Sequence, residues 1–79
     1  MTATIGDRLR LKQQLPYLKT ADPMPMLRPS DLVSLDEVGE VVAIHPLDTV
    51  AVRFRRGTFL ISLDQLKAAS QDDADDVMD

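Results

Sequence analysis

The chain has 79 residues, no cysteine and a formal net charge of −4. A chain this short forms one domain with a small core, and without cysteine it has neither disulfides nor a thiolate zinc site to brace it. The amino-terminal residues lack the basic and apolar regions of a signal peptide, and no apolar run is long enough to span a bilayer. We therefore expect a cytoplasmic protein without membrane insertion.

The negative charge is concentrated at the carboxyl terminus. Five of the thirteen acidic residues lie in the last eight positions, namely Asp72, Asp73, Asp75, Asp76 and Asp79. Like charges in a stretch with almost no apolar content do not offset their ordering entropy. We expect one folded domain over residues 1–69, followed by a disordered acidic tail over residues 70–79.

The first half of the chain predicts one strand and a long loop. Leucine alternates with cations from Arg8 to Lys12, which predicts a strand that buries Leu9 and Leu11. Four prolines then follow within fourteen residues, and proline lacks a backbone donor and has a fixed φ. We therefore expect a proline-rich extended loop over residues 14–30, after which residues 32–38 return to the core as a short strand or arm.

Three short strands are expected in the second half, over residues 40–44, 50–55 and 58–63. In the second of these, apolar residues alternate with Arg53 and Arg55, which is the period-2 signature of a half-buried strand. Gly57 is free to take the positive φ that a tight hairpin needs. Residues 63–67 then predict a single helical or 3₁₀ turn, and residues 66–69 a short last strand.

This order of elements is typical of an SH3-like barrel, which suits a chain too short for a helix-covered sheet. We therefore expect a mostly β fold, a small five-stranded SH3-like barrel with a long loop after the first strand. A helical hairpin over residues 60–70 is the competing interpretation. The expected core comprises Leu9, Leu11, Val41, Ile44, Val50, Val52, Phe54, Phe59, Ile61 and Leu66.

Catalytic chemistry is not indicated by the sequence. The single histidine, His45, stands in a predicted turn beside Pro46, and the acidic residues outside the tail are scattered. A metal site needs convergent ligands, and a phosphate-binding loop needs clustered glycines. We expect no enzyme activity, no catalytic residues, no metal and no cofactor.

Cations at outward strand positions form a candidate basic patch of Arg8, Arg10, Lys12, Arg53, Arg55 and Arg56. Such a patch suits nucleic acid or an acidic protein surface, but outward charges also serve simply to prevent edge aggregation. Nucleic-acid readers of this architecture add stacking aromatics, and the chain has only three aromatic residues. That shortage argues against nucleic acid.

The loop is rich in apolar residues for a segment with so many prolines. A proline-stiffened ribbon loses little entropy on docking, and methionine adapts to irregular partner surfaces. The alternative, weighted equally, is that Met24 and Met26 fold down and plug the barrel mouth, and we expect one of the two methionines to be buried and the other exposed. The candidate partner-binding residues are Tyr17, Leu18, Lys19, Met24, Met26, Leu27, Arg28, Arg53 and Arg55.

The stretches LPYLKTADPMPMLRP, DLVSLDEVGEVV and AVRFRRGTFLI closely resemble the SipA family of small cyanobacterial regulatory proteins, which is named for its interaction with the sensor histidine kinase NblS. The resemblance covers about residues 5–67. It implies an SH3-like barrel without enzymatic activity that binds the ATP-binding region of the kinase. It also implies a role in light and nutrient stress signalling.

The leading hypothesis from the sequence is therefore a monomeric interaction module that binds and modulates a sensor histidine kinase of a two-component system. Two alternatives are a nucleic-acid-associated small β-barrel and a peripheral subunit of a photosynthetic or redox complex.

Overall fold

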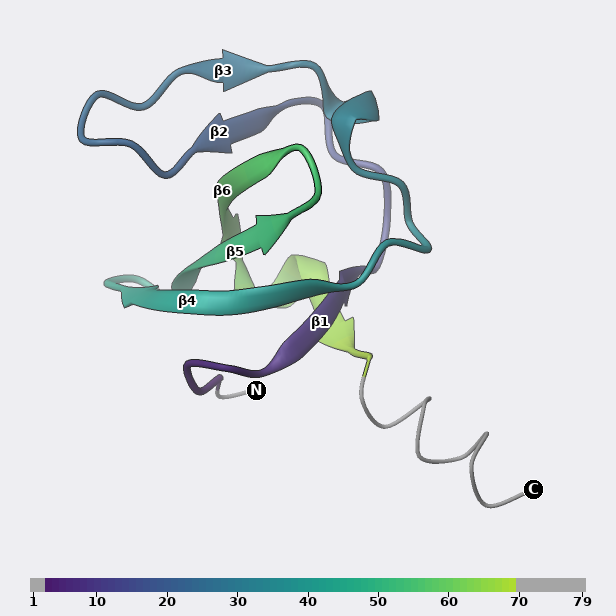
Figure 1. Cartoon of the computed structure of the whole chain (residues 1–79), viewed down its shortest axis with the longest axis vertical. Helices are drawn as coiled ribbons and strands as arrows, with labels where there is room; N and C mark the ends of the chain where they lie inside the picture. Colours follow the sequence, from purple (N-terminus) through teal and green to yellow (C-terminus); the bar gives the residue numbers. More distant parts are fainter. Residues whose placement is uncertain (1–2, 70–79) are drawn as a thin grey trace.

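Three consecutive strands form the centre of the computed structural model, which describes residues 3–69 (Figure 1). They are β4 (Gly39–His45), β5 (Thr49–Phe54) and β6 (Gly57–Ser62), and neighbouring strands are antiparallel. The β-branched and aromatic residues of these strands fit a pleated, half-buried surface. The predicted meander is confirmed, with strand ends that each differ by one residue.

A β-bulge in β4 changes which residues face the core. Val41 pairs with Val52 but Ala43 pairs with Ala51, so Val42 is an extra residue in the ladder. The prediction that Ile44 belongs to the core is wrong, because its side chain is 52% exposed. Strand β1 pairs only with Gly39 and Glu40 of β4. The second half of β4 therefore has a paired strand on one side only, and Ile44 is left uncovered.

The two hairpin turns of the meander both use positive φ. Gly57, at the start of β6, has φ +148°, as the sequence predicts. In the turn between β4 and β5, Leu47 and Asp48 have φ values of 63° and 56°. The N–H of Leu63 donates to the carbonyl of Asp48 at 2.8 Å, which holds this turn against the sheet. Leu47 itself is 93% exposed.

The strain at Leu47 leads to a stability prediction. A left-handed conformation costs a non-glycine residue about 1–2 kcal/mol, and asparagine tolerates it better than leucine. Leu47→Asn should therefore raise the free energy of unfolding by about 0.5–1 kcal/mol, measured as a thermal midpoint a few degrees higher. Asp48→Asn is the control and should leave the midpoint nearly unchanged. A lower midpoint for Leu47→Asn would contradict the turn geometry.

Strands β1 (Arg8–Leu11) and β7 (Leu66–Ala68) extend the meander beyond β4. Leu9, Leu11 and Leu66 are buried, and β1 pairs with β7 through Leu9 and Ala68, Arg10 and Lys67, and Leu11 and Leu66. The 3₁₀ helix η2 (Leu63–Gln65) connects β6 to β7. The predicted helical turn and last strand are confirmed, and a helical hairpin over residues 60–70 is excluded.

The proline-rich segment is more regular than predicted. Residues 14–30 contain a hairpin of β2 (Leu18–Thr20) and β3 (Leu27–Arg28), and β2 also pairs with β6. All four prolines lie outside these strand residues, so their missing donors interrupt no ladder. The predicted extended loop is therefore not confirmed. The 3₁₀ helix η1 (Ser30–Leu32) follows, and no strand occupies residues 33–38, although Val33 is fully buried.

The described strands form one antiparallel sheet of seven strands in the order β3-β2-β6-β5-β4-β1-β7. The mostly β fold is confirmed. The five predicted strands are neighbours in this order, but β2 and β3 add to them, and the pairings within residues 3–69 do not link β7 back to β3. The five-stranded barrel is therefore not confirmed. The predicted acidic tail, residues 70–79, lies outside the described residues, so the expected division into domain and tail stays a prediction.

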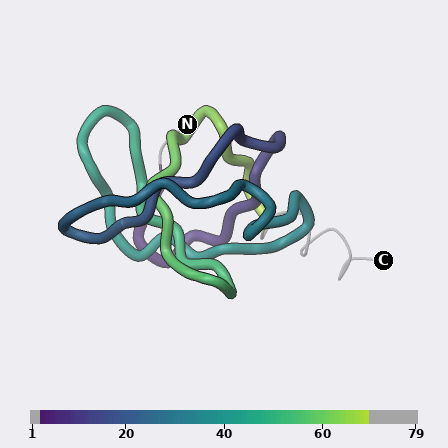
Figure 2. Tube along the Cα trace, turned by 90° about the horizontal axis from the view of Figure 1, so that it is seen from above, coloured from purple at the N-terminus to yellow at the C-terminus, as the bar shows by residue number. Residues whose placement is uncertain are grey.

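The turns of the β2–β3 and β4–β5 hairpins project from the same side of the molecule. Figure 1 shows both turns at the left of the view, and Figure 2, seen from above, shows them at the left again. The opposite ends of these strands meet β1 and η1. Loops on one side of a rigid sheet are where binding residues commonly gather.

Candidate functional site

The β2–β3 hairpin carries a group of exposed apolar side chains. Met24 is 83% exposed and Leu27 is 64% exposed, while Met26 and Tyr17 are also exposed. These side chains do not plug the end of the sheet, so that alternative for the two methionines is excluded. We call Tyr17, Met24, Met26 and Leu27 the hairpin surface.

Backbone and side-chain hydrogen bonds hold the hairpin in place. The N–H of Thr20 donates to the carbonyl of Met26 at 2.9 Å, and the N–H of Met26 donates to the hydroxyl of Thr20 at 2.8 Å. The N–H of Ala21 donates to the carbonyl of Thr58 at 3.0 Å and joins the hairpin to β6. Met26 and Leu27 are therefore held on hydrogen-bonded or paired backbone, while Met24 lies in the connection between β2 and β3 and Tyr17 precedes β2.

Leu18 is not a partner-binding residue, contrary to the prediction. It is 1% exposed, because pairing of β2 with β6 turns alternate residues of β2 into the core. Lys19 next to it is exposed and pairs with both Leu27 and Leu60. A strand could not be inferred here from such a short alternation between prolines, so the burial of Leu18 was missed.

A shallow hollow of about 320 Å³ separates the hairpin from the β5–β6 turn. Met26 and Arg28 line it from the hairpin, Arg56 lines it from the turn, and Asp22 adds one carboxylate. Phe59 lies at its base and is buried. We call it the Arg28–Arg56 hollow. Tyr17 lines a different hollow with Lys19 and Leu60, so the predicted partner-binding residues of this segment do not share one hollow.

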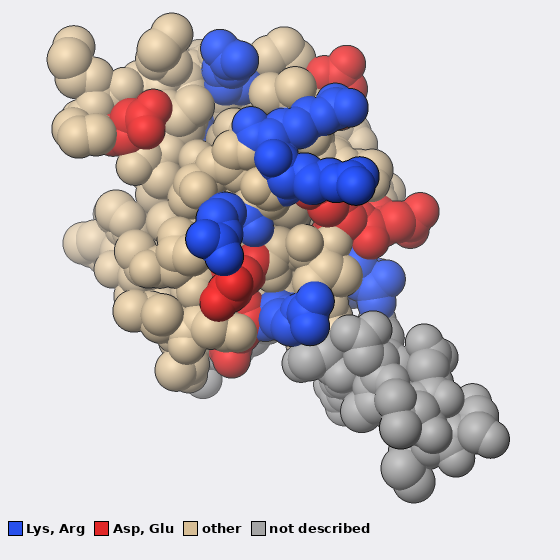
Figure 3. Space-filling model, in the orientation of Figure 1, with Lys and Arg blue, Asp and Glu red and all other residues tan. Residues whose placement is uncertain are grey.

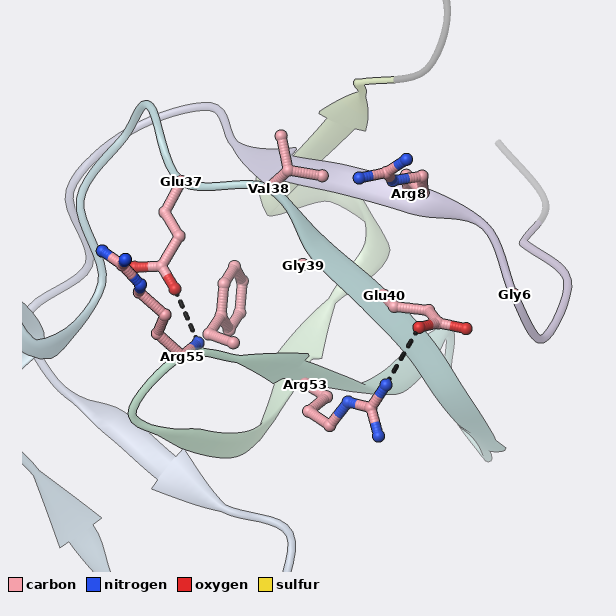
Figure 4. Close-up of a pocket in the computed structure, with 9 residues that line it drawn as sticks. Gly6, Arg8, Glu37, Val38, Gly39, Glu40, Arg53 and Arg55 are labelled. Atoms are coloured by element: carbon pink, nitrogen blue, oxygen red, sulfur yellow. Dashed lines mark hydrogen bonds and ion pairs between the residues drawn. The ribbon is translucent and has the colours of Figure 1, made fainter.

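A cleft of about 680 Å³ lies at the other side of the β5–β6 turn (Figure 4). Arg8 reaches it from β1, Arg53 from β5, and Arg55 from the turn that follows β5. Glu37 and Glu40 also line it, from the segment before β4 and from β4 itself. We call it the Arg8–Arg55 cleft.

Each glutamate of this cleft already has a partner. Glu40 Oε1 lies 3.1 Å from Nη2 of Arg53, which forms an ion pair across the β4–β5 ladder. Glu37 Oε2 accepts a hydrogen bond of 2.7 Å from the backbone N–H of Arg55. Figure 4 shows both contacts, on either side of Gly39. Glu37 and Glu40 thus fix the backbone and one arginine, while the cleft stays lined by three cations.

The structure brings only part of the predicted basic patch together. Arg8, Arg53 and Arg55 share the cleft, and Arg56 lies in the neighbouring hollow. Lys12 instead lines a hollow with Leu47 and Asp64, at a distant part of the sheet. Period-2 alternation can show that a cation points outward, but the strand order decides which outward cations are neighbours. The sequence did not place Glu37 and Glu40 beside these arginines, for the same reason.

Two kinds of site find no support within residues 3–69. No group of three or more histidine or acidic side chains is close enough there to hold a metal ion. The helices of this region, η1 and η2, have three residues each, and none is long and apolar enough to cross a membrane.

A family of known proteins matches most of the chain. The model of the CRR42-like family, described as Protein CHLORORESPIRATORY REDUCTION 42-like, matches residues 5–66. The chain belongs to the CRR42-like family. Among curated relatives, Protein CHLORORESPIRATORY REDUCTION 42, chloroplastic, from Arabidopsis thaliana is 36% identical over 72 residues, which is 90% of this chain. The chain spans 60% of the length of that relative. No solved structure matches the chain significantly.

Membership of the CRR42-like family corrects four predictions. The resemblance to the SipA family is wrong, because the matched family and the relative carry a different name. The predicted histidine-kinase partner is therefore also wrong, and so is the predicted role in two-component signalling. The expected cytoplasmic location is also wrong, since the CRR42 relative is named as chloroplastic. The three stretches that suggested SipA lie within residues 5–66, so the same residues identify the CRR42-like family.

Proposed function

We propose that this chain is a non-enzymatic docking module that acts as a peripheral component of a photosynthetic or respiratory redox complex. The CRR42-like family supports this, because the name of its Arabidopsis relative refers to chlororespiratory reduction in the chloroplast. The proposal also agrees with the absence of cysteine in the chain and with the exposed position of His45 in strand β4. Neither feature suits a nucleophile or an organised general base.

The observation that carries the proposal is the hairpin surface. Interfaces between proteins are enriched in tyrosine, methionine and arginine at their cores, relative to the rest of the surface. Tyr17, Met24, Met26 and Leu27 expose such side chains, with Met26 and Leu27 on hydrogen-bonded or paired backbone and Arg28 beside them. A prepositioned apolar surface loses less entropy on binding than a free loop does. This hairpin is therefore the proposed contact with the complex.

The fold supports a finer proposal about architecture. Strands β6, β5, β4, β1 and β7 are consecutive in the sheet, and a 3₁₀ helix precedes the last of them. We propose that these five strands are an SH3-like core, to which the β2–β3 hairpin is added at the edge of β6. The hairpin then takes the place of the proline-rich loop after the first strand.

A binding experiment tests the docking role. Tagged full-length chain is mixed with photosynthetic membranes solubilised in mild detergent, and the complexes are separated on a native gel. We expect the chain to migrate with a band that shows electron-transfer activity by in-gel dye reduction. Leu27→Ser should weaken binding at least tenfold and so reduce this co-migration strongly, because truncating an interface anchor typically costs about 2 kcal/mol.

Ile5→Ser is the matched control for that experiment. Ile5 is 64% exposed, the same fraction as Leu27, but it lies in the segment before β1 and not in the hairpin. Its replacement should leave co-migration unchanged. Equal losses in both variants would show that exposed apolar area, and not the hairpin, controls binding. Migration of the wild-type chain away from every active band would refute the docking role.

A further inference from the structure

The arginines of the chain are gathered on one surface. Of its six arginines, three line the Arg8–Arg55 cleft and two line the Arg28–Arg56 hollow. None of the three lysines lines either place. Figure 3 shows Lys and Arg side chains gathered on one face, with acidic side chains beside them. We call Arg8, Arg28, Arg53, Arg55 and Arg56 the arginine surface.

The cleft and the hollow are two halves of one surface. Arg55 lines the first and Arg56, the next residue, lines the second, so the β5–β6 turn forms the ridge between them. Phe54 and Phe59 support the ridge from inside, with ring centroids 6.4 Å apart. An extended segment that crosses the turn would meet cations on both sides.

Most of these guanidinium groups are available to a ligand. Arg53 is in contact with Glu40. Among the described residues, the side chains of the other four form no ion pair and no hydrogen bond: Arg8, Arg28, Arg55 and Arg56. The guanidinium is planar, always charged and shaped to donate two parallel hydrogen bonds to a carboxylate or phosphate. The preference for arginine over lysine here therefore points to an oxyanion ligand.

We propose that the arginine surface binds an acidic segment of the protein partner through its side-chain carboxylates. The inference rests on the proposed docking role and adds the chemistry of the segment that is bound. A phosphate backbone fits less well, because Asp22, Glu37 and Glu40 place carboxylates inside both halves. They would repel a backbone that is charged at every unit, whereas an acidic segment can place uncharged residues opposite them. The aromatic rings below the surface, Phe54 and Phe59, are buried and offer no stacking platform.

The proposal is tested with defined probes and the full-length chain. A fluorescent Glu-Ser repeat peptide is titrated at low salt, followed by its Gln-Ser counterpart and by single-stranded DNA of equal charge. Anisotropy should show binding of the Glu-Ser peptide, little or none of the Gln-Ser peptide, and weaker binding of the DNA. Combining Arg8→Gln with Arg55→Gln should reduce affinity for the Glu-Ser peptide about tenfold, the loss expected when charged hydrogen bonds are removed.

The matched control combines Lys12→Gln with Lys67→Gln. It removes the same amount of charge from exposed positions that line neither half of the arginine surface, and affinity should fall by less than about twofold. Arg8→Lys with Arg55→Lys keeps the charge but should lose part of the affinity, because lysine cannot donate two parallel hydrogen bonds to one carboxylate. All three double variants should keep the thermal midpoint of the wild type.

Three results would overturn the proposal. These are equal losses in the arginine and lysine variants, equal binding of the Glu-Ser and Gln-Ser peptides, or DNA binding that is tighter than peptide binding and is lost in the arginine variant. The last result would assign the surface to nucleic acid. Each leaves the hairpin test with Leu27→Ser unaffected, so failure of this inference is distinguishable from failure of the docking role.

Discussion

Phe54→Ala should lower the free energy of unfolding by about 3–5 kcal/mol, the usual cost of emptying a buried aromatic site. Phe54 is 5% exposed and packs against Phe59 with the rings tilted by 34°. A domain of this size has a total stability of only about 5–10 kcal/mol, so the loss is a large part of it. The thermal midpoint should fall by well over ten degrees or the transition should disappear, as measured by circular dichroism.

Tyr17→Ala provides the control for this prediction. It removes an aromatic ring of similar size from a half-exposed position on the hairpin surface, where most of the ring already contacts water. The midpoint should change by only a few degrees. An unchanged midpoint for Phe54→Ala would contradict the register in which Phe54 pairs with Gly57 and faces the core.

Gly39→Ala should also destabilise the fold strongly. A Cβ atom built at Gly39 would lie 2.5 Å from Cγ1 of Val52 and 2.7 Å from Cε1 of Phe54. These distances are far below van der Waals contact, so side chains or backbone must move, at a cost of about 1–3 kcal/mol or somewhat more. Urea unfolding should show a lower midpoint with an unchanged slope, because the surface exposed on unfolding stays the same.

A double-mutant cycle identifies the cause of this loss. Val52→Ala removes the atom nearest to the new Cβ, so the combination of Gly39→Ala and Val52→Ala should cost less than the sum of the two single changes. Additive losses would show that Gly39 is needed for another reason, such as its pairing with Leu9 across the β1–β4 ladder. The comparison therefore separates steric crowding from backbone pairing.

The candidate site was predicted only in part from the sequence. The sequence left the burial of Met24 and Met26 open between two equally weighted alternatives, and the structure shows both side chains exposed. The sequence predicted a basic patch that contains both Arg8 and Arg55, and the two residues do line one cleft. It did not predict that Arg28 lines the same hollow as Arg56. Their place in one hollow depends on β2 pairing with β6, which joins segments about forty residues apart in the chain.

Recognition of a family from short motifs was the weakest step. Strand motifs such as AVRFRRGTFLI contain the alternation and turn residues that many small β folds need, so they carry little information about function. A match over residues 5–66 uses the whole domain and identifies the CRR42-like family. The surfaces proposed for function, the hairpin surface and the arginine surface, both lie within that match.

The sequence by itself determined the central meander, β1, β7 and most of the core. Their signals are local: alternation with period 2, a glycine at the β5–β6 turn and β-branched residues in short runs bounded by turn residues. Each of these acts through neighbours in the chain, so it can be recognised without knowing the partner strand.

Only the tertiary structure decided the β2–β3 hairpin, the burial of Leu18 and the exposure of Ile44. Leu18 is buried because β6 offers β2 an open edge, and Ile44 is exposed because β1 ends its pairing with β4 at Glu40. Strand pairing and the end of a sheet are long-range events, and the same local pattern is compatible with either outcome. The neighbours of the arginines were decided in the same way, by strand order and not by spacing along the chain.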